Sequence, residues 1–186
     1  MKRLFCAIKI PPSNALYEAM ATFNEALAGE RVNWVDLQNL HLTLKFFGDT
    51  APQMEQNILR ALKKATENTR AFSFDLEGCG SFGPPKTPRV VWIGASRANG
   101  MVSLYEQVNK QLKPYGYEPD KITFVPHLTL GRIKSMQNLT LFKQMLIVYQ
   151  NTHFGHIDIN RFFLYQSTLT PEGPIYKVIE EFKLSE

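Results

Sequence analysis

The chain has 186 residues, of which 44% are hydrophobic and 20% charged, and it carries a formal net charge of +4. This length suits one domain or two small lobes that share a core, and the composition excludes a disordered chain and a long repeat array. A positive charge this small permits an anionic partner such as RNA or a phosphate ester, but an ordinary soluble domain would carry it equally well.

The first half of the chain alternates short apolar runs with amphipathic segments. The run Leu4–Ile10 predicts a strand that stops at two prolines, and a capped helix follows it and ends at Gly29. A second amphipathic helix is expected to begin near Pro52, because proline is tolerated in the first turn of a helix. The other strands expected in this half are Val32–Val35, Leu40–Phe47 and Phe72–Leu76.

The second half begins with the most turn-rich stretch of the chain, residues 78–88, which is either a solvated connection or the rim of a site. A helix that contains Met101 and Leu112 is expected later, and Pro126 interrupts an apolar run and indicates an edge strand or a bulge. The strands expected here are Arg89–Ala95, Thr123–Ile133, Ile157–Leu169 and Tyr176–Leu184, with a short helix around Leu139–Tyr149. Because strands and helices do not alternate strictly, the pattern predicts an α+β fold with largely antiparallel sheets.

The N-terminus and the cysteines indicate the compartment. Lys9 interrupts the first apolar run, so no signal peptide is expected, and no apolar run reaches the roughly 20 residues of a membrane span. Cys6 and Cys79 are far apart and form no CxxC pair, which fits a reducing compartment. We therefore expect a cytoplasmic protein with no membrane contact.

The most informative feature is a duplicated tetrapeptide, His-Leu-Thr-Leu, at residues 41–44 and again at residues 127–130. Each copy lies on an expected strand, where successive side chains point to opposite faces. His41 and Thr43 therefore share one face, as do His127 and Thr129, while the leucines point into a core. Two such strands from related lobes could place two imidazoles and two hydroxyls around one cleft.

This arrangement suits the cleavage of a phosphoester, which needs a base for the attacking oxygen and an acid for the leaving oxygen. The pKa of imidazole is ordinarily about 6.5, so a neutral and a protonated histidine can coexist near neutral pH. Threonine hydroxyls on the same face could donate to the non-bridging phosphate oxygens. A single His-x-Thr pair is more often an ordinary hydrogen-bonded strand pair, but the duplication favours a site.

A metal site is the competing interpretation. Two histidines without a matching carboxylate or cysteine cluster make a poor zinc site, so no metal is expected at the tetrapeptides. His153 and His156, with Asp158 nearby, could be nominated as ligands. Their spacing predicts different faces of a strand, which favours surface or packing roles.

Two basic residues beside the tetrapeptides are candidates for binding phosphate. Lys45 falls on the face of His41 by strict alternation, whereas Arg132 would point the other way unless Gly131 permits a bulge. A guanidinium clamp on the phosphate and an ordinary surface arginine are equally good interpretations of Arg132.

Several aromatic residues could stack on a terminal base, although most large aromatic side chains in a chain of this size lie in the core. These candidates are Phe46, Phe124, Trp92 and Tyr176.

The paired tetrapeptides resemble those of the two-histidine phosphoesterase superfamily, and in particular the RNA 2′,3′-cyclic phosphodiesterases, also called 2′-5′ RNA ligase-like proteins. The likeness extends over nearly the whole chain. Its further segments are Leu4–Ile8, Phe46–Gly48, Pro88–Trp92, Gly94, Phe124–Pro126, Arg132, Ser167–Leu169, Gly173–Pro174 and Tyr176. The resemblance implies a single bilobal α+β domain over residues 1–186, with two antiparallel sheets, flanking helices, pseudo-twofold symmetry and an active cleft between the lobes.

The resemblance also implies hydrolysis of a terminal RNA 2′,3′-cyclic phosphate to a 2′-phosphomonoester, without a metal or other cofactor. His127 would be the proton acceptor that activates water, His41 the proton donor to the leaving 3′ oxygen, and Thr43 and Thr129 would hold the phosphate oxygens. The expected partners are RNA ends or small nucleotides bearing the cyclic phosphate, bound by a monomer. Two alternatives stay open: joining of RNA ends through a 2′-5′ linkage, and binding of phosphate-terminated RNA without turnover.

Overall fold

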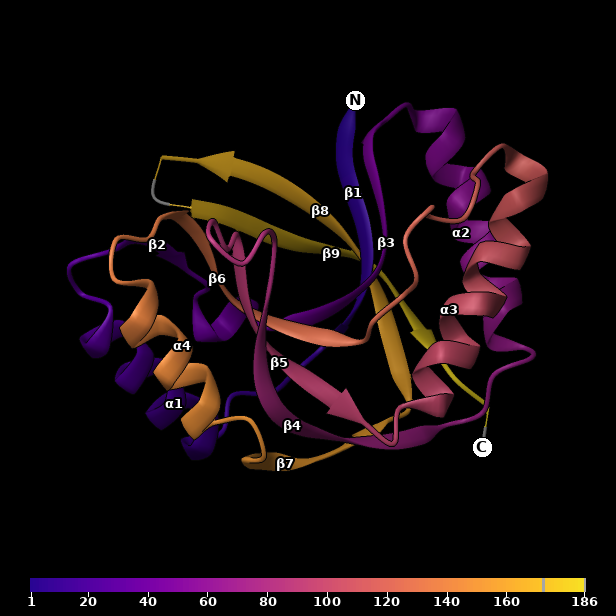
Figure 1. Cartoon of the computed structure of the whole chain (residues 1–186). Coiled ribbons are helices and arrows are strands. Elements are labelled where there is room, and N and C mark those ends of the chain that lie inside the picture. The colour runs from indigo at the N-terminus through magenta and orange to yellow at the C-terminus, as the bar shows by residue number, and fades with distance from the viewer. Residues whose placement is uncertain (172, 186) are drawn as a thin grey trace.

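The computed structural model describes residues 1–171 and 173–185, and over these residues α-helices flank two antiparallel sheets (Figure 1). The first sheet, which we call sheet A, has the strand order β3-β1-β8-β9, and sheet B has the order β2-β6-β5-β4-β7. The strands of sheet A are β1 (Lys2–Lys9), β3 (His41–Thr50), β8 (Arg161–Thr170) and β9 (Gly173–Lys183). The strands of sheet B are β2 (Arg31–Trp34), β4 (Phe72–Phe82), β5 (Val90–Ser96), β6 (His127–Ser135) and β7 (His153–Ile159).

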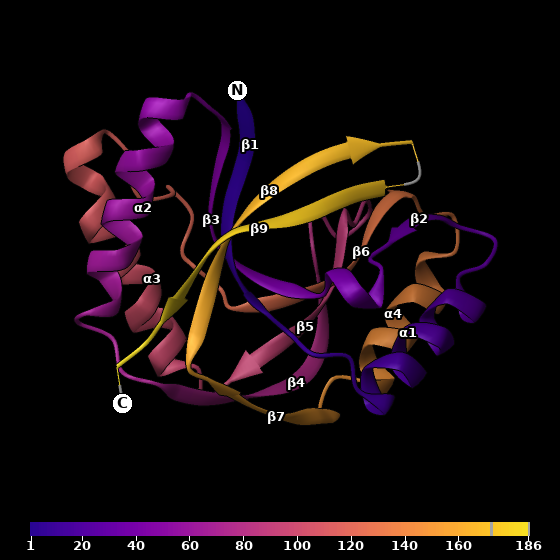
Figure 2. The same cartoon turned by 180° about the vertical axis from the view of Figure 1, so that it is seen from behind.

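The helices pair at the two ends of the molecule, α1 with α4 and α2 with α3 (Figures 1 and 2). They are α1 (Asn14–Ala26), α2 (Pro52–Thr66), α3 (Asn99–Leu112) and α4 (Leu139–Val148), with two short 3₁₀ helices, η1 (Leu37–Asn39) and η2 (Lys113–Tyr115). The Ser13 hydroxyl accepts a hydrogen bond from the Leu16 amide and caps α1, where the sequence predicts a capped helix without deciding between Ser13 and Asn14. Pro52 occupies the first turn of α2, as the sequence predicts. No helix in the described part of the chain has the length and hydropathy needed to cross a membrane.

One hydrophobic cluster lies between the sheets and joins them. It includes Leu4 and Ile8 on β1 of sheet A together with Ile93 on β5 and Leu128 on β6 of sheet B. The leucines of both tetrapeptides are fully buried in it. The predicted α+β architecture with two antiparallel sheets and flanking helices is confirmed.

Three expected strands differ by four or more residues from the observed ones. β4 extends to Phe82 rather than ending at Leu76, so it includes the first part of the turn-rich stretch at residues 78–88. β6 begins at His127 rather than at residue 123, because Pro126 has no amide hydrogen to donate to a sheet. The expected strand Ile157–Leu169 is two strands, β7 and β8, which belong to different sheets and are separated at Asn160. An apolar pattern reports burial but not which sheet a residue joins, so it does not reveal this crossing.

Candidate active site

The two tetrapeptides open the two strands that approach each other between the sheets. His41 is the first residue of β3, at the edge of sheet A, and His127 is the first residue of β6 in sheet B. β3 and β6 contact each other although no hydrogen-bond ladder joins them. Histidines that are 86 positions apart in the chain are thereby brought to one region of the molecule.

Each histidine makes the same hydrogen bond to its own backbone. Nδ1 of His41 lies 2.6 Å from the carbonyl oxygen of Asn39, and Nδ1 of His127 lies 2.7 Å from that of Val125. A carbonyl oxygen can only accept, so Nδ1 carries a proton in both rings. The opposite nitrogen, Nε2, is therefore the atom that gains or loses a proton as each ring titrates.

Both imidazoles have pKa values below the ordinary histidine value. Burial lowers the pKa of His41, the bond to Asn39 opposes that shift, and the positive charges of Arg132 and His127 lower it further. Burial likewise lowers the pKa of His127, against the bond to Val125, and Arg132 adds to the lowering. The charge interactions mean that His41, His127 and Arg132 lie within electrostatic range of one another.

Aromatic rings hold each imidazole on two sides. The His41 ring has its centroid 5.1 Å from Phe5 and 5.4 Å from Tyr176, which meets it edge-on. The His127 ring has its centroid 4.8 Å from Phe82, again edge-on, and 6.4 Å from Trp92. These contacts restrict the rings and remove water from them, which is the cause of the lowered pKa values.

Matching β-bulges at the last residue of each tetrapeptide decide which later side chains share the histidine face. On β3 the extra residue is Leu44, since Cys6 pairs with Lys45 but Ala7 pairs with Thr43. On β6 the extra residue is Leu130, since Val91 pairs with Gly131 but Trp92 pairs with Thr129. After each bulge the alternation is reversed.

The bulges reverse the directions that strict alternation predicts for the side chains of Lys45 and Arg132. Arg132 lines the pocket beside His41, because a bulge redirects it, although the bulge lies at Leu130 and not at Gly131. The prediction for Lys45 is wrong, because the bulge turns this side chain into the interior. Its ammonium donates to the carbonyl oxygen of Glu118 at 2.8 Å and to Asp120 Oδ1 at 3.1 Å.

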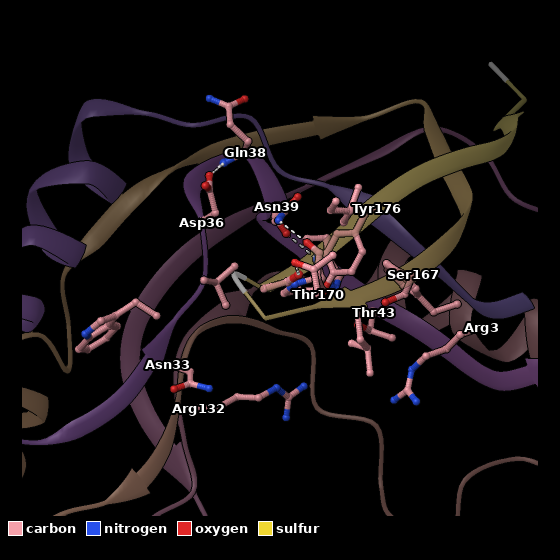
Figure 3. Close-up of a pocket in the computed structure, with 18 of the residues that line it drawn as sticks. Arg3, Asn33, Asp36, Gln38, Asn39, Thr43, Arg132, Ser167, Thr170 and Tyr176 are labelled. Atoms are coloured by element: carbon pink, nitrogen blue, oxygen red, sulfur yellow. Dashed lines mark hydrogen bonds between the residues drawn. The ribbon is translucent and has the colours of Figure 1, made fainter.

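A pocket of about 1050 Å³ opens around the face of β3 that carries His41 and Thr43 (Figure 3). Its far wall is the end of the β8–β9 hairpin, which reaches over β2 and β6 (Figure 1). Sites for one small ligand have volumes of roughly 300–1,000 Å³, so this pocket has room for more than a phosphate group. Arg132 is the residue of β6 that lines it, whereas His127 and Thr129 do not line it directly, and His127 acts on His41 through its charge.

The aromatic candidates divide into pocket and core residues. Phe46 is half exposed and lines the pocket, and so does Tyr176. The prediction for Phe124 is wrong, because its ring stacks on Tyr105 at 4.0 Å between centroids and packs against the core, outside the pocket. Sequence reasoning missed the roles of Phe5 and Phe82, which hold the histidines, because isolated phenylalanines in strands usually belong to the core.

The second pair of histidines lies on sheet B, outside the pocket. His156 Nδ1 is 2.7 Å and His153 Nε2 is 3.6 Å from the same oxygen of buried Asp75. Both rings therefore lie beside one carboxylate, although their spacing predicts opposite faces of the strand. The reason is a bulge that interrupts the β4–β7 ladder between Leu76 and Glu77. Over the described residues, no group of three or more His, Cys, Asp or Glu side chains is arranged to hold a metal ion.

Comparisons with known proteins agree with this geometry. The family model described as LigT like Phosphoesterase matches the chain twice, over residues 8–92 and 93–176. The chain is 33% identical to an RNA 2′,3′-cyclic phosphodiesterase of Methanocaldococcus jannaschii, over 97% of this chain and 99% of that one. It is 39% identical to a protein of the same name from Aquifex aeolicus, over 81% of each chain.

Solved structures share the whole fold. A crystal structure from Thermus thermophilus matches with a TM-score of 0.79 and 28% identity, over 98% of this chain and 97% of that one. E. coli LigT complexed with 3′-AMP matches with a TM-score of 0.77 over 100% and 99% of the two chains. Its sequence is 22% identical, so this second likeness is one of fold.

Proposed function

The chain belongs to the LigT-like phosphoesterase family, and from this premise we propose that it is an RNA 2′,3′-cyclic phosphodiesterase. The observation that carries the proposal is the pair of interacting histidines, each fixed by a carbonyl bond at Nδ1 with Nε2 left to exchange a proton. One base and one acid beside a bound phosphate are what the hydrolysis of a cyclic phosphodiester requires.

In this reaction water attacks the phosphorus atom of the 2′,3′-cyclic phosphate. Nε2 of His127 accepts a proton from the water, and protonated Nε2 of His41 donates one to the 3′ oxygen as its bond to phosphorus breaks. The product is a 2′-phosphomonoester with a free 3′ hydroxyl. Arg132 and the hydroxyls of Thr43 and Thr129 stabilise the negative charge on the non-bridging oxygens.

The substrates on this proposal are RNA ends or small nucleotides that bear the cyclic phosphate. Both histidines come from one chain and from both sheets, so residues 1–186 act as one domain and a monomer is sufficient. Both cysteines are free thiols, which supports a cytoplasmic location. General acid, general base and charge stabilisation all come from side chains, so turnover is expected without an added metal.

The test is ring opening of a short RNA that ends in a 2′,3′-cyclic phosphate, measured in the presence of EDTA. His41→Ala and His127→Ala should each lower turnover by roughly 10² to 10⁴, the usual range for a general acid or base. His153→Ala is the matched control, because His153 lies outside the pocket and Asp75 keeps its bond to His156. Binding of the RNA without turnover by the unmodified protein would contradict the proposal.

A separate measurement tests which histidine is the general acid and which is the general base. A substrate with sulfur in place of the 3′ oxygen has a leaving group that needs no proton, so it should largely restore turnover to His41→Ala. His127→Ala should remain impaired, because water must still be activated. The opposite pattern of rescue would exchange the two roles.

A further inference from the structure

The pocket holds more positive charge than the reacting group needs. A cyclic phosphodiester carries a single negative charge at neutral pH. Of the described residues that line the pocket, two carry a guanidinium group, Arg3 and Arg132, and one carries a carboxylate, Asp36. Asp36 already accepts the Gln38 amide at 2.8 Å and lies at the opposite side of the pocket from Arg3 (Figure 3).

The side chain of Arg3 is directed into the pocket rather than onto a neighbouring carboxylate. In the β1–β3 ladder Arg3 pairs with Asp49, yet the two form no ion pair at 4.0 Å or less in the described structure. The guanidinium carbon instead lies 4.8 Å from the centroid of the half-exposed Phe46 ring. A guanidinium stacked in this way keeps its N–H groups free at the edge of the plane, where they can bind an anion.

Arg3 and Arg132 flank one region of the pocket. Figure 3 shows their guanidinium groups on opposite sides, with Thr43 between them in this view. Both positive charges act on the Tyr176 phenol, where they partly oppose the increase in pKa that burial causes. Arg132 follows the β6 bulge, next to the tetrapeptide that contains His127, so we assign it to binding the phosphate that reacts. The Arg3 guanidinium can therefore bind a second anion.

Resting on the proposed function, we propose that Arg3, stacked on Phe46, binds the phosphodiester that precedes the terminal nucleotide. In RNA the nucleotide that carries the 2′,3′-cyclic phosphate is joined through its 5′ oxygen to that phosphodiester, which is the nearest other anion. A mononucleoside 2′,3′-cyclic phosphate has a 5′ hydroxyl instead. The preferred substrate of the pocket is therefore an RNA end of at least two nucleotides, and a free cyclic mononucleotide is a poorer substrate.

The test compares a dinucleotide with a mononucleoside, both ending in a 2′,3′-cyclic phosphate. The unmodified protein should prefer the dinucleotide in kcat/KM by about 10- to 100-fold, the range expected for a charge-assisted hydrogen bond. Arg3→Gln should remove most of that preference, and Phe46→Leu should reduce it. Arg60→Gln, which removes one exposed positive charge on α2, is the matched control and should retain the preference.

A chemical variant of the substrate identifies the group that Arg3 binds. A dinucleotide with an uncharged methylphosphonate at the internal linkage should lose the preference with the unmodified protein but lose nothing further with Arg3→Gln. An equal penalty in both proteins would overturn the proposal, and so would an equal effect of Arg3→Gln on the two ordinary substrates. If the proposed function itself fails, the unmodified protein opens neither cyclic phosphate, which is a different result.

Discussion

At the scale of single residues, the environment of the two histidines determines how activity depends on pH. Both pKa values are lowered from 6.5, first of all by burial, so both rings are largely neutral in the free protein at pH 7. His127 is then ready to accept a proton, but His41 is in its acid form in only a small fraction of molecules. Catalysis requires one neutral and one protonated ring at the same time.

We therefore expect a bell-shaped profile of kcat/KM whose maximum lies below about pH 6.5, because both limbs report the lowered pKa values of the free protein. Bound phosphate adds a negative charge beside the rings and raises both pKa values, so the maximum of kcat should lie at a higher pH. Steady-state kinetics across the acidic and neutral range measure both profiles. A kcat/KM maximum above pH 7 would show that burial does not control the pKa values of these two histidines.

At the scale of secondary structure elements, the sequence predicts where β3 and β6 lie but not how their side chains are directed after the first four residues. Strict alternation assigns Lys45 to the pocket and Arg132 away from it. The bulges at Leu44 and Leu130 reverse both assignments. Neither leucine differs from an ordinary strand residue, so the bulge has no local signature in the sequence except the glycine that follows Leu130.

Glycine is needed at position 131 for a different reason from the one the sequence suggests. Gly131 does not adopt a positive φ, in contrast to Gly48 on β3, so the bulge does not depend on glycine's conformational freedom. A Cβ atom at Gly131 would lie 2.8 Å from Trp34 Cε3 and 2.9 Å from Val32 Cγ1. Gly131 is thus required for the close packing of β2 against β6.

Gly131→Ala should push β2 away from β6 and destabilise the protein by about 1–3 kcal/mol, the usual cost of overpacking. It should also lower turnover, because Arg132 is the next residue and Trp34 lines the pocket. Urea unfolding and a turnover assay measure the two effects. Gly29→Ala is the matched control, since a Cβ atom there meets nothing within 4 Å and the stability should change by less than about 0.5 kcal/mol. Equal stability of the two variants would contradict this packing argument.

At the scale of the whole molecule, the repeat is more informative than any local pattern. The duplicated tetrapeptide predicts two related strands, and each of them pairs with a strand that comes before it in the chain and leads into a helix: β3 pairs with β1, which precedes α1, and β6 pairs with β5, which precedes α3. What the sequence does not reveal is the crossing at Asn160, after which β8 and β9 complete sheet A. This return of the chain places the β8–β9 hairpin over the pocket and links the two sheets.

Because the hydrophobic cluster contains residues of both sheets, we expect the two lobes to unfold as one cooperative unit. The two thiols can report this, since Cys6 lies on β1 in sheet A and Cys79 on β4 in sheet B. Burial raises the pKa of each thiol to about 12, so both should react slowly with a thiol reagent at pH 8 while the protein is folded, buried Cys6 more slowly than partly exposed Cys79. Unfolding should accelerate both reactions.

The variants Cys79→Ser and Cys6→Ala each leave one thiol, and their labelling rates should rise with urea along parallel slopes, because both thiols are exposed by the same global transition. Inorganic phosphate, if it binds between the sheets, should slow both reactions equally, since a ligand of the folded state opposes every global opening. A Cys79 rate that rises with urea along a shallower slope than the Cys6 rate would show instead that sheet B opens alone. The site would then be assembled from two independently moving lobes, and the fixed geometry of the two histidines would depend on substrate binding.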